Sequence, residues 1–155
     1  MELTESYAFA GPPLAVWNLL IDPNVVASCL PGCDHLEQIA EDRYLASLSF
    51  KVAAIGGQFG GTIAILDKQA PRSYTMVVEG AGRPGFVRGR ARLELTEKDG
   101  GTVVLVTGEA EVGGLIASVG QRLLHTASKM MVDRFFACLR EKVSVPADPK
   151  GPALA

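Results

Sequence analysis

The chain is organised around one stretch, Gly113-Gly114-Leu115-Ile116-Ala117-Ser118-Val119-Gly120-Gln121-Arg122-Leu123-Leu124-His125, which continues without proline to Val143. At about 100° per residue, its apolar side chains share one wide stripe and most polar side chains lie on or beyond the opposite margin. The stripe comprises Leu115, Ile116, Val119, Leu123, Leu124, Ala127, Met130, Met131, Phe135 and Cys138. The stretch therefore predicts one long amphipathic helix over 113–143 that covers another element.

Two residues interrupt this stripe. Gly120 lies within it, although glycine inside a helix costs about 1 kcal/mol relative to alanine. Arg134 projects from its middle. One interpretation packs the Arg134 stem at the sheet edge and leaves the guanidinium in water. The other has the guanidinium meet a polar group of a ligand or a buried acid, and the first interpretation is favoured.

The composition is that of one soluble domain with its own core. Its 155 residues are 48% hydrophobic and 21% charged, and the net charge of -2 offers no general attraction to nucleic acid. No apolar run reaches the roughly 18 residues that cross a bilayer, and the N-terminus does not resemble a signal peptide. The three cysteines, an odd number, argue against a disulfide framework and for a reducing compartment. We therefore expect a cytoplasmic protein.

Periodicity and turn residues divide the rest of the chain into strands and two short helices. A strand is expected over 2–10. Gly11-Pro12-Pro13 ends it and starts a helix, and Asp22-Pro23 starts a second helix that ends at Pro31-Gly32. Six further strands are expected over 35–39, 43–52, 58–66, 73–79, 88–97 and 102–112. The glycine-rich segment 80–88 is predicted to be a longer, mobile loop.

The last two strands form the best-defined hairpin. Asp99-Gly100 is typical of a two-residue hairpin turn, and this turn sets the register of the strands. One face then pairs apolar or small residues: Leu95 with Val104, Leu93 with Val106, Ala91 with Gly108, and Gly89 with Ala110. The other face pairs Arg90 with Glu109, Arg88 with Glu111, and Arg92 with Thr107. The arginine row is therefore interpreted as a solvated strand face rather than a surface for nucleic acid or anionic lipid.

The order of elements is strand, two short helices, six strands and one long helix. Sequential antiparallel strands need one apolar face covered, and the terminal helix supplies that cover. The expected fold is α+β, with a curved seven-stranded antiparallel sheet wrapped on the long C-terminal helix. Residues 1–143 are expected to form one domain, and 144–155, with three prolines and no periodicity, a flexible tail.

Small residues face one another across the expected interior. The inward-facing residues of the hairpin become smaller away from the turn, down to Ala91 and Gly108, and the facing helix carries Gly120. Either the helix and sheet approach closely and fill the space, or they stay apart and leave an apolar pocket for a small molecule. Composition alone gives these alternatives equal weight. In the second, the two short helices with Trp17 and the loop at 80–85 form the mouth.

No motif indicates a metal site or a catalytic nucleophile. Cys29 and Cys33 do not form a C-x-x-C pair, and only His35 is close enough in sequence to join them as a zinc ligand. Cys138 lies on the helix stripe and is expected to be a free core residue. Serine, histidine and acid are not grouped as a hydrolase requires. The cluster 56–61 lacks the Gly-Lys-Ser/Thr ending of a phosphate-binding loop.

Several short motifs occur in a fixed order. They are Pro12-Pro13 followed by Val16-Trp17, Leu20 and Asp22, then Cys29-Leu30-Pro31-Gly32-Cys33, Gly101-Thr102, Val112-Gly113-Gly114-Leu115-Ile116-Ala117-Ser118-Val119-Gly120, and Phe135-Phe136. With the element order, they make the chain resemble the START-like (SRPBCC, helix-grip) superfamily and, more narrowly, the CoxG family of carbon monoxide dehydrogenase subunits. The resemblance spans about residues 1–143.

The resemblance implies a non-enzymatic accessory protein of a molybdenum-containing hydroxylase of the carbon monoxide dehydrogenase type. It also implies membrane recruitment and a quinone or other lipid-like ligand in the cavity, and it favours the hollow interior. The expected ligand-binding residues are Trp17, Phe50, Phe59, Leu124 and Met131, with Ala91, Gly108 and Gly120 providing room and Arg134 a polar contact. No metal and no covalent cofactor is expected. Because the tail 144–155 cannot form an amphipathic segment, support for peripheral contact with the inner face of the membrane is weak.

Two other functions stay open. A cyclase-like or aromatase-like enzyme would use the same cavity with inward polar groups, for which Arg134, Tyr44 and Tyr74 are the candidates. A pure docking module would have a closed cavity and would bind a partner enzyme through its outer sheet or helix face.

Overall fold

The computed structural model describes residues 1–144, which form a seven-stranded antiparallel sheet covered by helices. The strands are β1 (Glu2–Phe9), β2 (Cys33–Ala40), β3 (Arg43–Val52), β4 (Ile55–Gln69), β5 (Ser73–Gly82), β6 (Gly85–Lys98) and β7 (Gly101–Gly113). The helices are α1 (Pro13–Leu20), α2 (Pro23–Cys29), the 3-10 helix η1 (Leu115–Val119) and α3 (Gln121–Ser144). The sheet order is β1-β7-β6-β5-β4-β3-β2, and the predicted α+β fold is confirmed. The predicted tail, apart from Ser144, lies outside the described residues.

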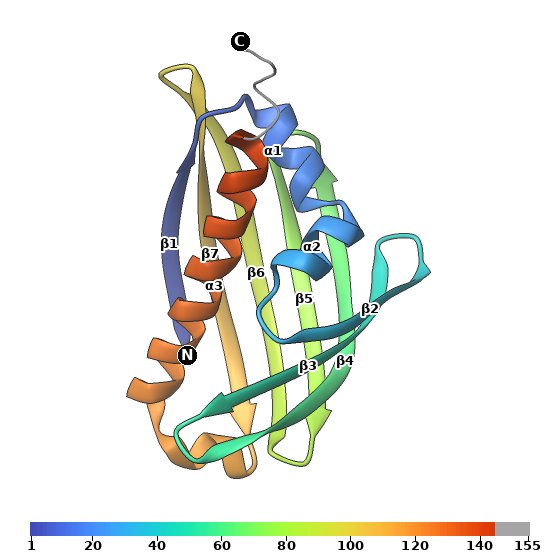
Figure 1. Cartoon of the computed structure of the whole chain (residues 1–155), viewed down its shortest axis with the longest axis vertical. Coiled ribbons are helices and arrows are strands. Elements are labelled where there is room, and N and C mark those ends of the chain that lie inside the picture. The colour runs from blue at the N-terminus through green and yellow to red at the C-terminus, as the bar shows by residue number, and fades with distance from the viewer. Residues whose placement is uncertain (145–155) are drawn as a thin grey trace.

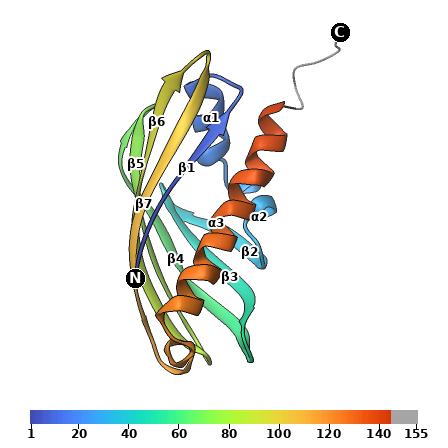
Figure 2. The same cartoon turned by 90° about the vertical axis from the view of Figure 1, so that its left-hand side faces the viewer.

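All three α-helices lie on one face of the sheet. The long helix α3 lies next to β1 and β7, with α1 and α2 beside it (Figure 1). The side view shows β2, β3 and β4 curling toward α3 (Figure 2). Because strand side chains alternate, one face turns inward and buries Tyr74, Leu93 and Val106, while the other carries the charged residues.

Local sequence signals set the starts of the two short helices. Pro13 occupies the first turn of α1, where its missing N–H leaves no hydrogen bond unmade. The Asp22 side chain accepts a hydrogen bond from the Asn24 N–H at 2.9 Å and caps α2, and Pro23 follows it. Both helices begin where the sequence predicts.

The β6–β7 register is also confirmed. Lys98 pairs with Gly101 and encloses the turn, and Ala91 pairs with Gly108. Asp99 and Gly100 have φ angles of 51° and 81°. Positive φ at both central residues is what the tight hairpin turn with the correct twist requires.

The predicted single helix over 113–143 is wrong in its first part. Gly114, with φ 83°, precedes η1, and Gly120, with φ 94°, ends η1 before α3 begins at Gln121. Such φ angles favour glycine and lie outside the helical region. Gly120 is therefore a break between two helices rather than a gap in one apolar stripe.

The predicted loop over 80–88 is wrong because strands extend through most of it. β5 runs to Gly82 and β6 starts at Gly85, which leaves Arg83-Pro84 as the turn. A Cβ on Gly82 would lie 2.0 Å from the Gln58 carbonyl oxygen. The glycine thus allows a close approach of two strands.

A disulfide joins Cys29 of α2 to Cys138 of α3, whose Cα atoms are 5.4 Å apart. The expectation that Cys138 is free was wrong, because an odd number of cysteines requires only one unpaired thiol, here Cys33. The inference of a reducing compartment rested on the same count, so the cysteines no longer support it.

Apolar packing forms two clusters along α3. The upper cluster contains Trp17, Tyr74, Leu93, Phe136 and Leu139 among its buried residues. The lower cluster consists of Phe59, Ile116 and Leu124, with half-buried neighbours from β3, β6 and β7. The two clusters hold α3 against the sheet at separate points.

Candidate ligand-binding site

An open hollow lies between the two clusters, on the inner face of the sheet. Its volume is about 160 Å³, and its walls include Leu3, Met76, Val78, Ala91, Gly108 and Ser128. Met76 and Ala91 also pack against the upper cluster, and Met1, another wall residue, packs against the lower one. The hollow is therefore a part of the interface between the sheet and α3 that neither cluster fills.

Small side chains on neighbouring strands create this space. Ala91 pairs with Gly108, and in the next inner row Gly89 pairs with Ala110. Over two consecutive inner rows, β6 and β7 thus project nothing larger than a methyl group toward α3. The walls are mainly apolar; Ser128 of α3 adds a hydroxyl at the edge, and Arg90 and Glu109 also border the hollow.

The inner face beside the hollow is only partly covered. The register pairs Val78 with Ile63 and Met76 with Ile65 of β4, and both isoleucines are half-buried. Tyr44 of β3 lies in the same row as Ile63 and is also half-buried. Partial burial, followed by the charge of nearby Asp42, raises the pKa of the Tyr44 hydroxyl.

Two of the predicted binding residues, Ala91 and Gly108, line the hollow. Trp17 lies above it in the upper cluster, 3% exposed, with its ring centroid 5.5 Å from that of Tyr74. Phe59 and Leu124 lie in the lower cluster.

Four other predicted residues also lie outside the walls of the hollow. Phe50 packs against Phe59, with ring centroids 4.7 Å apart, and Met131 is half-buried on α3. Gly120 and Arg134 are exposed, and the structure of residues 1–144 gives Arg134 no hydrogen bond or ion pair. The Arg134 guanidinium therefore lies in water, as the favoured interpretation has it, and ligand contact by these four residues stays a prediction.

The candidate catalytic side chains do not form one polar group. Arg134 is exposed and Tyr44 is half-buried on β3. Tyr74 is 3% exposed, and burial raises the pKa of its hydroxyl. Within residues 1–144 that hydroxyl has no hydrogen-bond partner. Sets of three or more His, Cys, Asp or Glu side chains that could hold a metal ion are also absent from this part of the chain.

A polar network between β1 and α3 was not foreseen from the sequence. Tyr7 donates a hydrogen bond to Asp133 Oδ1 at 2.7 Å, and Lys129 donates to Asp133 Oδ2 at 2.8 Å. Lys129 also lies 3.7 Å from Glu5. Two features of the sequence could have indicated this network. Lys129 and Asp133 have the i,i+4 spacing of a helical ion pair, and Glu5 interrupts the apolar face of the first strand.

This network shifts two ionisations in opposite directions. Hydrogen bonds from Lys129 and then from Tyr7 lower the pKa of Asp133 below its ordinary value of 3.8. Burial, followed by the hydrogen bond to the Asp133 carboxylate, raises the pKa of Tyr7. The network therefore favours a charged Asp133 and a neutral Tyr7.

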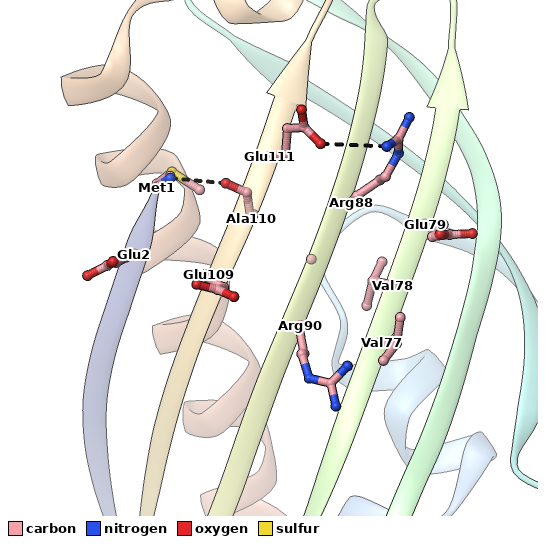
Figure 3. A pocket seen from close by; sticks show the side chains of 11 residues that line it. Met1, Glu2, Val77, Val78, Glu79, Arg88, Arg90, Glu109, Ala110 and Glu111 are labelled. Atoms are coloured by element: carbon pink, nitrogen blue, oxygen red, sulfur yellow. Dashed lines mark hydrogen bonds and ion pairs between the residues drawn. The ribbon is translucent and has the colours of Figure 1, made fainter.

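A larger groove of about 400 Å³ lies on the outer face of the sheet (Figure 3). Its walls include Val77, Glu79, Arg88, Arg90, Glu109 and Glu111. Arg88 pairs with Glu111 at 3.6 Å, whereas Arg90 points toward β5 and away from Glu109 (Figure 3). Because four acids, Glu2 among them, and two bases line this groove and are open to water, it does not suit an apolar ligand, and we place the candidate site on the inner face.

The chain matches the family described as CoxG, a subunit of carbon monoxide dehydrogenase, over residues 8–144. No curated protein sequence matches it. Within residues 1–144, none of the helices combines the length and the apolar character that crossing a bilayer demands.

Solved structures share the fold. A conserved protein from Geobacillus kaustophilus is 34% identical, with a TM-score of 0.89 over 93% of this chain and 95% of that one. A Thermus thermophilus protein is 16% identical, with a TM-score of 0.73 over 96% of this chain and 100% of that one. The di-domain ARO/CYC protein BexL is 12% identical, with a TM-score of 0.65 over 94% of this chain and 50% of that one. The helix-grip fold is thereby confirmed, and the likeness to the last two proteins shows the fold alone.

The two buried tyrosines give opposite expectations for removal of a hydroxyl. Tyr7→Phe removes a hydrogen bond to a carboxylate and should lower the free energy of unfolding by about 1–3 kcal/mol. Tyr74→Phe removes a buried hydroxyl without a protein partner and should leave the free energy of unfolding unchanged or raise it. Urea unfolding of both variants checks this, and a larger loss in Tyr74→Phe would contradict it.

The network also predicts a pH dependence. Because the pKa of folded Asp133 is depressed, its stabilisation is present above the ordinary value of 3.8 and is lost as pH falls through the folded pKa. The stability difference between wild type and Asp133→Asn should therefore shrink between about pH 6 and about pH 3. Urea unfolding across this range measures it, with Glu141→Gln, an exposed position on α3, as the control. A difference that stays constant or grows on acidification would refute the assignment.

Proposed function

Because the chain belongs to the CoxG family of carbon monoxide dehydrogenase subunits, we propose that it is a non-enzymatic accessory protein that binds a lipophilic small molecule beneath α3. The ligand class is a quinone or another lipid-like molecule. As partner we propose a molybdenum-containing hydroxylase of the carbon monoxide dehydrogenase type. The accessory protein would recruit this enzyme or deliver the bound molecule to it as an electron acceptor. The family name supports the partner, and the apolar hollow supports the ligand class.

The observation that carries the ligand proposal is the pair Ala91 and Gly108. These residues leave the hollow open between two well-packed clusters, and Met76 and Val78 give it apolar walls. Ligand sites are typically concave and mainly apolar with few polar groups. The Ser128 hydroxyl provides one such group: it donates to the Met1 sulfur at 3.7 Å and can exchange this weak acceptor for a ligand carbonyl.

The size of the hollow limits how the ligand binds. A volume of about 160 Å³ is smaller than the roughly 300–1,000 Å³ of most drug-sized sites. We therefore place a ring-sized head in the hollow and an apolar chain along the half-buried Ile63 and Ile65 of β4, which adjoin it. This arrangement suits a molecule with one compact head and one aliphatic tail.

A cyclase-like or aromatase-like enzyme is the second candidate, and the fold shared with BexL is its support. It is less favoured because Tyr44, Tyr74 and Arg134 do not converge on the hollow. A docking module would use the charged outer face instead. The proposed location is the cytoplasm, in peripheral contact with the inner face of the membrane at most.

A titration with decylubiquinone tests the ligand proposal. Trp17, the one tryptophan of the chain, belongs to the upper cluster, against which Ala91 also packs, and reports binding by quenching of its fluorescence. Wild type should show saturable quenching. Ala91→Leu fills the hollow and should weaken binding at least about tenfold, a loss of about 1.4 kcal/mol.

The matched control is Ala137→Leu, which makes the same change at an exposed position of α3 and should bind as wild type does. Circular dichroism establishes that both variants are folded. Equal affinity of a folded Ala91→Leu variant would show that the ligand does not occupy the hollow.

A further inference from the structure

The short helix α2 has one buried side chain, and that side chain belongs to the disulfide. Cys29 is 5% exposed, whereas the other side chains of Pro23–Cys29 are half-buried or exposed. A short helix is stabilised mainly by packing of its apolar face. The covalent bond to Cys138 is therefore the principal attachment of α2 to α3.

The longer helix α3 does not depend on this bond. Phe136 and Leu139, which flank Cys138, are 2% and 0% exposed in the upper cluster. Asp133 of the same helix accepts the hydrogen bond from Tyr7. Breaking the disulfide should therefore free α2 and leave α3 in place.

Both ends of α2 are held by backbone hydrogen bonds. The Asp22 N–H donates to the Leu19 carbonyl at 3.3 Å, and the Ser49 N–H donates to the Gly32 carbonyl at 2.8 Å. The segment 22–32 is thus anchored at its two ends and cross-linked near its C-terminal end. Without the cross-link, it can move as a strap while the strands stay paired.

This strap packs against the same apolar cluster as two wall residues of the hollow, although no residue of 22–32 lines the hollow itself. Val25 of α2 packs against the upper cluster, as do Met76 and Ala91, which line the hollow. α2 lies over the inner face of the sheet, beside α3 (Figure 1). Movement of the strap therefore removes packing from the upper cluster, against which the wall residues Met76 and Ala91 lie.

We propose that Cys29 and Cys138 form a reversible redox site for a protein dithiol reductant, and that its reduction releases α2 and loosens the upper wall of the hollow. In a reducing compartment, a protein disulfide is typically transient or redox-sensing. The site thus reconciles the disulfide with the proposed cytoplasmic location. Its effect on ligand exchange rests on the proposed function, whereas the release of α2 does not.

The reaction is a two-electron thiol–disulfide exchange. A thiolate of the reductant attacks the sulfur of half-buried Cys138, which is more accessible than that of Cys29, and forms a mixed disulfide. The Cys29–Cys138 bond breaks, and Cys29 leaves as a thiolate that takes up a proton. The second thiol of the reductant loses its proton and attacks the mixed disulfide, which releases Cys138 as a thiolate that is then protonated. The reductant becomes a disulfide and the protein gains two thiols.

The third cysteine serves as a control. Cys33 is free, and burial raises the pKa of its thiol. Because the thiolate is the nucleophile in exchange, this shift disfavours attack of Cys33 on the disulfide. Cys33→Ser should therefore retain the full redox response.

Hydrogen–deuterium exchange of the full chain tests the release of α2. In Cys33→Ser, treatment with dithiothreitol should speed exchange of the amides in 22–30 at least about tenfold. Exchange in the β6–β7 hairpin should not change. Cys138→Ala should show the fast rates with or without dithiothreitol. If Cys138→Ala does not fold, the comparison of oxidised and reduced Cys33→Ser still measures the release of α2.

Two results would overturn the proposal. The first is a thiol titration that finds three free thiols in the denatured, unreduced protein, because the disulfide would then not have formed. The second is exchange in 22–30 that is the same in the oxidised and reduced proteins, or that rises equally in the hairpin.

Decylubiquinone dissociation from the two redox forms then tests the link to the hollow. Reduction should speed dissociation at least about tenfold. Equal dissociation rates would refute a loosened wall of the hollow in the reduced protein. If the amides of α2 respond while neither form binds the quinone, the proposed function fails and the redox site stands.

Discussion

The two apolar clusters hold α3 against the sheet, and their separation is the constraint on which the rest of the structure depends. The upper cluster fixes the C-terminal half of α3 through Phe136 and Leu139, and the lower cluster fixes its first turn through Leu124. Between them, the side chains of Ala91 and Gly108 are too small to fill the interface. Protein interiors are otherwise packed with few voids, so an unfilled region between two packed ones is a feature that function can use.

The glycine break before α3 belongs to the same arrangement. η1 buries Ile116 to 2% exposure in the lower cluster and leaves Leu115 61% exposed. A continuous helix would have put both on one apolar stripe, as the periodicity predicts. Periodicity identifies apolar positions but does not contain the φ angle of Gly120, so the break could not be predicted from the sequence.

Features that depend on neighbouring residues were predictable from the sequence. The β6–β7 register follows from Asp99-Gly100, and it brings Ala91 and Gly108 together correctly. The disulfide joins residues 109 apart in the sequence, and Tyr7 and Asp133 are 126 apart. No local signal pairs such residues, because their contact depends on how α3 packs across the sheet. Trp17 and Phe59 were predicted as pocket walls, and the structure packs them inside the two clusters.

The two faces of the sheet offer different chemistry to a partner molecule. The outer groove presents exposed charges from β5, β6 and β7, which suit contact with a polar surface. The inner hollow presents methyl and methylene groups, whose burial against a lipophilic ligand is favourable at roughly 25 cal/mol per Å². Val77 lines the groove alone and Met76 lines the hollow alone, whereas Val78 lies between these two residues' sites and borders both.

Val77 and Met76 therefore make the most direct test of a ligand site beneath α3. In a methyl-labelled sample saturated with decylubiquinone, intermolecular nuclear Overhauser effects report which methyl groups lie within about 5 Å of the ligand, close to the contact distances of apolar groups. A ligand in the hollow predicts such effects at Met76 and Val78 and none at Val77. Effects at Val77 without Met76, with or without Val78, would place the ligand on the outer face and contradict the account.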